Sequence, residues 1–338
     1  MKIFASLTVL LMLGQTLVEG QEKKPYPTFG KIISKDPHFF DKFVPKDAKI
    51  EKLATGFKWT EGPVWIKDGG YLLFSDIPNN TINKWKEGEG ISEYMKPSGY
   101  TGLKPRGGEP GSNGLLLDAK GRLILCEHGD RRVTRLEKNG KKTVLADKYM
   151  GKRLNSPNDA VFHSNGDLYF TDPPYGLEKV WDDPARELDF CGIYRISKDG
   201  KLTLLSKEMS RPNGIAFSVD EKTLYVANSD PEKAVWMAFP VKKDGTLGKG
   251  KVFFDATSWV SKTKKGLPDG MKIDEDGNLF ATGPGGVHVF SPKGEHLGTF
   301  DTGVATANCA FGGEDGNVLY IAADTSLARI KLKVKGKK

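Results

Sequence analysis

Six positions in this chain carry a carboxylate or carboxamide side chain in the same local setting. Each precedes a short apolar segment, and a tight-turn signal follows eight residues later. These anchor residues are Glu61, Asn113, Asn158, Asn213, Asp269 and Asn308. Carboxylate and amide oxygens suit a hard divalent cation such as Ca²⁺. If the anchors converge, a bound cation would offset the cost of burying them unpaired, about 1–3 kcal/mol for each group.

The same residues have a simpler interpretation as turn formers. Asn-Gly and Asp-Gly are common loop dipeptides, and a repeat can retain them because they shape the entry to a strand. That interpretation suits one isolated Asn-Gly. It explains less well six anchors in register, of which Glu61 and Asp269 are charged. We therefore favour convergence of the anchors on one metal site.

The elements that must position the anchors form a repeated hairpin. After each anchor an apolar run leads to a turn and then to a second strand-like run, as in Leu72–Phe74 and Leu168–Phe170. Successive anchors are separated by roughly 40 to 55 residues, the length of a four-stranded blade. No segment longer than about ten residues has helical periodicity. The pattern predicts an all-β, six-bladed β-propeller.

The chain after Asn308 is too short for a whole blade and leaves room for three strands. We expect the fourth to be residues 50–54, so that an N-terminal strand completes the last blade and leaves no open edge. The predicted propeller domain is 48–334. Residues 21–47 are assigned to a linker and lead-in, and 335–338 to a basic tail.

The first twenty residues predict export. Lys2 supplies a positive charge, residues 3–18 are mostly apolar, and small residues precede Gln21. This pattern is typical of a signal peptide cleaved after Gly20. A membrane anchor is the alternative, but the run is short and contains polar residues. We expect a periplasmic or extracellular protein without stable membrane insertion after cleavage.

The composition argues against several other classes. The net charge of +8 comes from lysine runs without interleaved aromatic residues, so nucleic acid is not expected as a partner. Cys126, Cys191 and Cys309 are too few for a disulfide framework or a zinc cluster and are expected to pack in the interior. The sequence leaves open whether any two of them form a disulfide, and it leaves the oligomeric state open.

A second set of polar residues is predicted at the same mouth as the anchors. The second strand of each hairpin runs antiparallel to the first, so its end returns to that mouth. His128 and Asp172 lie at such ends, and Tyr175 follows Asp172 in a proline-containing loop. They are candidates for substrate contact or proton transfer. For His128, a structural histidine beside Asp130 is an open alternative.

Four segments, 59–65, 154–177, 211–214 and 267–271, contain the motifs Glu-Gly-Pro, Pro-Asn-Asp, Pro-Asn-Gly and Pro-Asp-Gly-Met. They resemble the gluconolactonase/senescence-marker-protein (regucalcin) family over roughly residues 48–332. Together with 126–133, segment 154–177 resembles the bacterial exported gluconolactonase branch in particular. The resemblance implies a six-bladed propeller with one catalytic divalent metal in its channel.

Carried over by motif, the resemblance implies Glu61, Asn158, Asn213 and Asp269 as metal ligands. Ca²⁺ is the expected ion, with Mg²⁺, Mn²⁺ or Zn²⁺ as alternatives, although the absence of Cys and His anchors argues against a dedicated zinc site. Regucalcin-like members place an arginine two residues before the asparagine that matches Asn158. Serine stands there in this chain, at Ser156, which puts the exact sugar-lactone specificity in question.

The resulting hypothesis is metal-dependent hydrolysis of a sugar lactone. The cation would polarise the carbonyl and Asp269 would be the general base, while Asn113, His128, Asp172 and Tyr175 would bind the small-molecule lactone. Hydrolysis of another lactone or of a phosphotriester is one alternative. A secreted propeller that only binds sugar or protein is another, but a scaffold has no need for the converging charges of Glu61 and Asp269.

Overall fold

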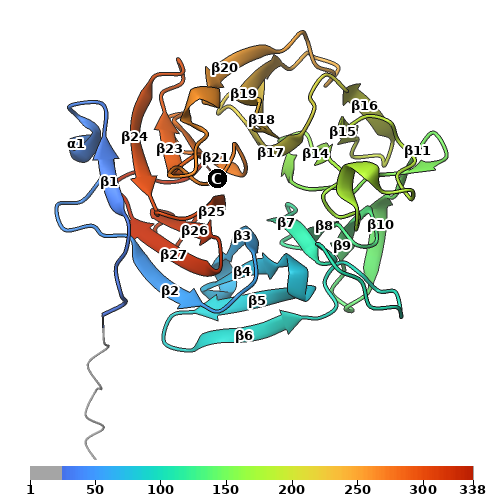
Figure 1. Ribbon diagram of the computed structural model, residues 1–338, viewed down its shortest axis with the longest axis horizontal. Coiled ribbons are helices and arrows are strands. Elements are labelled where there is room, and N and C mark those ends of the chain that lie inside the picture. The colour runs from blue at the N-terminus through green and yellow to red at the C-terminus, as the bar shows by residue number, and fades with distance from the viewer. Residues whose placement is uncertain (1–24, 338) are drawn as a thin grey trace, which may run out of the picture.

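The alternation of apolar runs and turns along the chain folds into six antiparallel sheets arranged in a ring around a central channel (Figure 1). The computed structural model describes residues 25–337. The prediction of an all-β, six-bladed β-propeller is therefore confirmed. The predicted signal peptide, residues 1–20, lies outside the described residues.

The first three blades follow one another along the chain, and in each the innermost strand comes first. Blade 1 consists of β3 (Thr60–Ile66), β4 (Tyr71–Asp76), β5 (Thr81–Lys86) and β6 (Gly90–Met95). Blade 2 consists of β7 (Ser112–Leu117), β8 (Leu123–Glu127), β9 (Arg132–Leu136) and β10 (Lys142–Ala146). Blade 3 consists of β13 (Ala160–Phe162), β14 (Leu168–Asp172), β15 (Gly192–Ile196) and β16 (Leu202–Ser206).

The remaining blades keep the same order, and the last two each gain a strand from the N-terminal part of the chain. Blade 4 consists of β17 (Pro212–Phe217), β18 (Thr223–Asp230), β19 (Lys233–Pro240) and β20 (Lys251–Asp255). Blade 5 consists of β21 (Met271–Ile273), β22 (Leu279–Gly283), β23 (Gly286–Phe290), β24 (His296–Asp301) and β1 (Lys31–Ser34). Blade 6 consists of β25 (Thr306–Gly312), β26 (Val318–Ala323), β27 (Ser326–Lys331) and β2 (Glu51–Thr55).

The ring closes in blade 6, where β2 pairs antiparallel with β27. Glu51 lies opposite Arg329, whose Nε donates a 2.7 Å hydrogen bond to the Glu51 carboxylate. Closure through an N-terminal strand, predicted for residues 50–54, is confirmed. The pairing supplies the fourth strand of blade 6 from the N-terminal part of the chain and joins the two ends of the ring.

The segment before the closing strand also contributes to the ring. Strand β1 pairs antiparallel with β24 as a fifth strand of blade 5. The short helix α1 (Phe39–Phe43) then packs Phe39 and Phe43 into a cluster with Phe280 and Phe300. Burial of these aromatic rings attaches the lead-in to blades 5 and 6.

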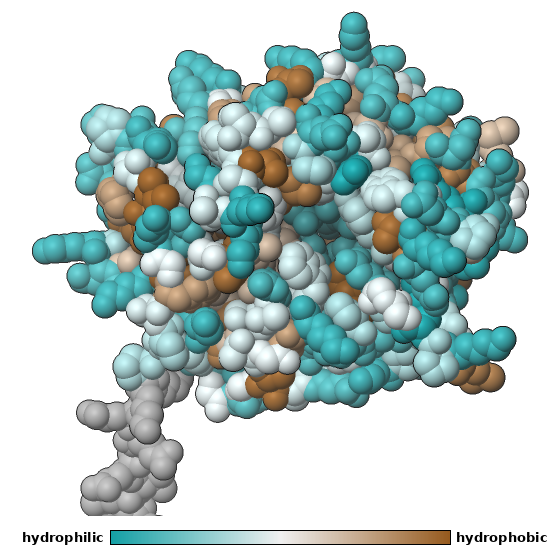
Figure 2. All heavy atoms as spheres, in the orientation of Figure 1, coloured by the Kyte–Doolittle hydropathy of each residue, from teal (hydrophilic) through white to brown (hydrophobic). Residues whose placement is uncertain are grey.

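Short elements occupy the loops between strands. They are the 3₁₀ turns η1 (Lys67–Gly69), η2 (Ile77–Asn79), η3 (Val180–Asp182) and η4 (Thr257–Trp259) and the ribbon β11 (Lys148–Tyr149) and β12 (Lys152–Arg153). Within residues 25–337, none of the helices has the length and apolar character needed to span a membrane. Hydrophilic residues cover most of the face seen in Figure 2, and this face is hollowed near the ring axis.

Candidate functional site

The glycines that follow four of the anchors hold neighbouring blades in close contact at the channel. A Cβ added to Gly62 would lie 2.1 Å from the carbonyl oxygen of Asn113, and one added to Gly214 would lie 2.2 Å from that of Asp269. A Cβ added to Gly114 would clash with the Asn158 carbonyl oxygen, and one added to Gly270 would clash with the Asn308 side chain. These glycines are therefore required for packing between blades, which the turn-former interpretation does not explain.

Hydroxyl groups near the end of the second strand fasten four of the blades to the next one. Ser75 Oγ donates to the Asn113 carbonyl at 2.9 Å, and Thr171 Oγ1 donates to the Asn213 carbonyl at 2.7 Å. In blades 4 and 5, Ser229 and Thr282 donate to the carbonyls of the residues just before Asp269 and Asn308. Part of the predicted polar rim thus fixes the spacing of the anchors.

Irregular strand pairing occurs at the anchors themselves. The register shifts between Glu61 and Val64 in blade 1, and comparable shifts flank Asn113, Asn213 and Asn308. A β-bulge bends the strand and redirects a side chain, and bulges are common beside active sites. Asn158 and Asp269 instead lie just before their strands, β13 and β21.

The first and last anchors meet where the ring closes. Asn308 Nδ2 donates a 3.0 Å hydrogen bond to Glu61 Oε2, which also accepts from the Gly62 amide at 2.8 Å. Both side chains are almost wholly buried. Together with the contacts of the glycines and hydroxyls above, this bond places all six anchors around one end of the channel, which we call the anchor end.

Several oxygen atoms at the anchor end are buried without a partner. Among the described residues, Oδ1 of Asn113, Asn213 and Asp269 has no hydrogen-bond donor. The Asn213 amide is oriented by its own bond, since Nδ2 donates to Ser229 Oγ at 2.9 Å. Unpaired buried polar atoms are rare in folded proteins, and a missing ion is one standard explanation.

The carboxyl groups at this end perturb one another. Burial raises the pKa of Glu61 to about 8, and the charges of Asp159 and Glu109 add to the effect. Burial also raises the pKa of Asp269 well above its ordinary value, and the charges of Glu61, Asp159 and Glu109 act in the same direction. Such a group of carboxyls favours a cation, because a positive charge would relieve both the burial and the repulsion.

Hard oxygen ligands are what the predicted metal set offers. Glu61, Asn158, Asn213 and Asp269 supply two carboxylates and two amides, a donor set that fits Ca²⁺ or Mg²⁺ better than zinc. Within residues 25–337, no group of three or more His, Cys, Asp or Glu side chains is close enough to hold a metal. The predicted set has only two such residues, so its fit rests on the amides and on the unpaired oxygens.

Of the predicted substrate-binding residues, Asn113 and Tyr175 lie beside the metal set. Asn113 is one of the anchors with an unpaired oxygen. Burial raises the pKa of the Tyr175 phenol, and the nearby Asp269 charge adds to it, while a hydrogen bond with Ser229 opposes it. The Tyr175 hydroxyl therefore lies near both Asp269 and Ser229.

Asp172 has a different environment from the one expected of a substrate ligand. Its Oδ2 and Oδ1 accept hydrogen bonds from the amides of Asn155 and Ser156, both at 2.8 Å. Asp76 and Asn228 hold the corresponding loops before Glu61 and Asn213. Since burial is complete and both oxygens are occupied, these contacts favour a role in positioning the loop before Asn158.

His128 is also buried completely, and its nearest ionisable neighbour is a residue that the sequence reasoning missed. Its Nδ1 lies 3.1 Å from the carboxylate of Glu109, in the loop between β6 and β7. Glu109 has no counterpart in the other blades, so the repeat pattern gives no signal for it.

Asp159 was missed as well. It is buried, with Oδ2 unpaired, and burial raises its pKa while the Lys272 cation partly offsets the shift. Asp159 occupies the position that glycine holds after four other anchors, and that departure from the repeat was the signal available in the sequence.

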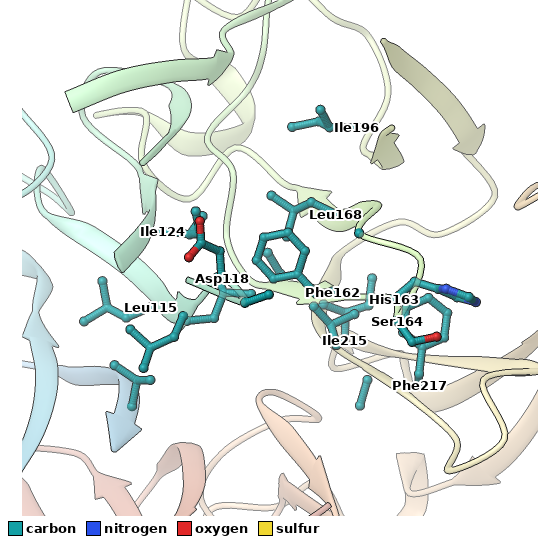
Figure 3. A pocket seen from close by; sticks show the side chains of 18 of the residues that line it. Leu115, Asp118, Ile124, Phe162, His163, Ser164, Leu168, Ile196, Ile215 and Phe217 are labelled. Carbon is teal, nitrogen blue, oxygen red and sulfur yellow. The ribbon is translucent and has the colours of Figure 1, made fainter. Parts of the chain in front are cut away.

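The opposite end of the channel has a different lining. A cavity of about 1350 Å³ is bordered by residues of the innermost strands from two positions beyond each anchor and by the turns and neighbouring strands that follow, and by none of the anchors. Figure 3 shows Leu115, Phe162 and Ile215 around this cavity. We call this end of the channel the apolar end. This cavity is therefore separate from the group of carboxylates and amides.

Comparison with known proteins gives consistent relatives. The family model described as "SMP-30/Gluconolactonase/LRE-like region" matches residues 59–325. A gluconolactonase from Zymomonas mobilis is 40% identical over 321 residues, covering 91% of this chain and 88% of the relative.

Solved structures agree on the fold. A gluconolactonase from Xanthomonas campestris is 30% identical with a TM-score of 0.76, covering 92% of this chain and 98% of that one. A calcium-binding protein, regucalcin, from Agrobacterium tumefaciens has a TM-score of 0.66 at 21% identity, covering 85% of this chain and 94% of that one, and supports the fold alone.

Proposed function

Because this chain belongs to the SMP-30/gluconolactonase/LRE-like family, we propose that it is a divalent-metal-dependent hydrolase that opens a sugar lactone. The relative from Zymomonas mobilis named gluconolactonase spans most of both chains and supports the reaction class. One observation carries the metal dependence. The unpaired oxygens of Asn113, Asn213 and Asp269 lie at the same end of the channel as the buried Glu61 carboxyl.

The proposed metal ligands are Glu61, Asn158, Asn213 and Asp269. Ca²⁺ is the favoured ion because all four supply hard oxygen atoms, and Mg²⁺ or Mn²⁺ are alternatives of the same ligand preference. When bound, the cation would polarise the lactone carbonyl and stabilise the negative charge that develops on its oxygen.

The chain's own residues account for the proton and for binding. We assign Asp269 to orient a water molecule and to take its proton as the water oxygen bonds to the carbonyl carbon. The bond between that carbon and the ring oxygen then breaks, and the ring oxygen gains a proton to give a hydroxy acid. Asn113 and Tyr175 contact the substrate, while Asp172 acts at a distance through the loop before Asn158.

Metal removal and substitution of Asp269 test this proposal together. Chelation should abolish opening of glucono-1,5-lactone, and added Ca²⁺ should restore it. Asp269→Asn should lower kcat by about 10²- to 10⁴-fold, the usual contribution of a general base. Asp199→Asn, which changes an exposed carboxylate at the apolar end, is the matched control and should retain activity. Full activity of the metal-free protein would refute the mechanism.

A substrate panel separates the alternatives. We expect turnover of aldonolactones to exceed that of unsubstituted lactones and of phosphotriesters. Preference for a phosphotriester would assign phosphotriester hydrolysis to the same site, because a bound cation can polarise a phosphoryl oxygen as well as a carbonyl oxygen. Binding of sugars without turnover of any substrate would favour a propeller that only binds its ligand.

A further inference from the structure

The loop between β6 and β7, residues 96–111, is held in a defined position over the anchor end. Asn80 Oδ1 accepts hydrogen bonds from the amides of Ser98, Gly99 and Tyr100, at 3.1, 2.8 and 3.1 Å. Farther along, Arg106 donates to the carbonyl oxygens of Gly129 and Gly176. The loop is thus attached to blade 1 at one end and to blades 2 and 3 at the other, which fixes the residues that follow Arg106.

Glu109 is the ionisable residue that this loop brings to the site. Its side chain is 34% exposed, and its Oε2 lies 3.1 Å from Nδ1 of the fully buried His128. Neither ring nitrogen of His128 forms a hydrogen bond of acceptable geometry among the described residues. Nδ1 nevertheless lies within ion-pair distance of Glu109, so it is the ring nitrogen placed to donate to that carboxylate.

The Glu109 carboxylate is close enough to the proposed metal set to act on its two carboxyl groups. Its charge contributes to the raised pKa of both Glu61 and Asp269, after burial and in the same direction as Asp159. On the other side, His128 is confined by blade 3, since a Cβ added to Gly176 would lie 2.5 Å from that of His128 and 2.7 Å from that of Ser156. The Cβ of His128 therefore packs against blade 3 while its Nδ1 lies beside Glu109, and Glu109 is the member of the pair with access to solvent.

We propose that Glu109, positioned by His128, is the residue that recognises a hydroxyl group of the substrate. The inference rests on the proposed lactone hydrolysis and names a determinant of its specificity. A partly exposed carboxylate accepts hydrogen bonds only, and bonds to a charged acceptor are about twice as strong as neutral ones. A neutral, polyhydroxylated lactone satisfies such an acceptor. A lactone without hydroxyls would leave it unpaired, and sites built for a hydroxyl discriminate strongly against analogues that lack one.

This proposal alters the role that the sequence suggested for His128. We infer that Glu109 touches the substrate and that His128 acts through it as a positioning residue. Kinetics can separate these two roles, because a side chain that only donates a hydrogen bond to Glu109 can be replaced by another donor at the same position. The amide nitrogen of asparagine lies near the position of Nδ1, whereas leucine offers no donor.

The test is steady-state kinetics of glucono-1,5-lactone opening by the Ca²⁺-loaded protein. Glu109→Gln should raise KM about tenfold with kcat little changed. His128→Leu should have a smaller effect of the same kind, and His128→Asn should restore a KM near that of the wild type. Asp182→Asn, which removes an exposed carboxylate from η3 in the loop after β14, is the control and should leave both constants unchanged.

A binding measurement makes the result independent of turnover. 1,5-Anhydroglucitol carries ring hydroxyls but no carbonyl, so calorimetry should show weaker binding to Glu109→Gln than to the wild type. An unchanged KM and unchanged binding in Glu109→Gln would overturn the proposal, as would a lower kcat at constant KM. Absence of lactone opening by the wild type would instead refute the proposed function, and the calorimetric comparison would still decide the role of Glu109.

Discussion

The two ends of the central channel are built from the same six inner strands but by opposite means. At the anchor end, glycines and hydroxyls bring buried carboxylates and amides into contact, and several oxygens have no partner. At the apolar end, the continuation of the same strands presents side chains such as Leu115 and Ile215 to an open cavity. Close contacts between blades therefore fix the side chains of the anchor end, where several hydrogen-bond acceptors have no donor. The apolar end borders an open cavity and is less constrained.

The difference shows that the fold is locally destabilised at the anchor end, where buried oxygen atoms have no hydrogen-bond donor. Unpaired buried oxygens lower the stability of a metal-free protein and persist only where the surrounding structure enforces them. Here the enforcing contacts are main-chain contacts between blades, as between Gly214 and Asp269. We expect substitutions at the anchor end to change function first, and substitutions at the apolar end to change stability first.

Outside the proposed metal ligands, the largest effect should come from Gly214→Ala. Its Cβ would lie 2.2 Å from the Asp269 carbonyl oxygen, so Asp269 must move. A displacement of about 1 Å can cost about 10²-fold in rate, and we expect that loss in kcat/KM together with weaker Ca²⁺ binding by calorimetry. Gly121→Ala, at a turn of the apolar end with φ of +72° and no atom within 4 Å, should cost about 1 kcal/mol in stability and spare Ca²⁺ affinity. Equal Ca²⁺ affinity in both variants would contradict the proposed contrast.

Ile215→Ala should show the reverse pattern. Ile215 is 1% exposed beside the cavity, and removal of a buried aliphatic side chain costs about 2–5 kcal/mol of unfolding free energy. Denaturant unfolding would measure this loss. Below the unfolding transition, kcat/KM should stay within about twofold of the wild type. A large fall in kcat with intact stability would show that the apolar end takes part in catalysis.

The smallest effect is the dependence of stability on pH. The pKa of Glu61 is raised from 4.5 to about 8, so the folded metal-free protein retains a proton that the unfolded chain has released. Stability should therefore be greatest below about pH 4.5 as far as Glu61 is concerned, and should fall by about 2–3 kcal/mol between pH 6 and pH 8. Thermal unfolding with a chelator would measure the fall. Saturating Ca²⁺ should flatten the profile, because the ion stabilises the ionised carboxylate. A metal-free profile that rises over this range would contradict the raised pKa.

The repeat made most of the fold predictable. Six anchors in register predicted the blades, and the short segment after Asn308 predicted closure by a strand near residue 51, where the structure has β2. Strand β1 was not foreseen, because a four-residue segment is too short to show a periodic signal.

The site was predictable only as far as the repeat extends. The position of Asn113 and Tyr175 beside the metal set follows from strand direction. Glu109 reaches the site from an irregular loop, and its location depends on contacts with Asn80 and Gly176 that are remote in sequence. The carboxylate of Asp172 faces main-chain amides, because a loop before each anchor must be held, and sequence alone does not separate that requirement from ligand binding.

The hydrogen bond between Glu61 and Asn308 joins residues that are 247 positions apart. During synthesis, one partner leaves the ribosome long before the other exists. A growing chain, or one truncated before blade 6, would therefore present Glu61, the first of the proposed metal ligands, without the amide that orients it. If Glu61 binds the cation as proposed, tight binding would therefore depend on closure of the ring.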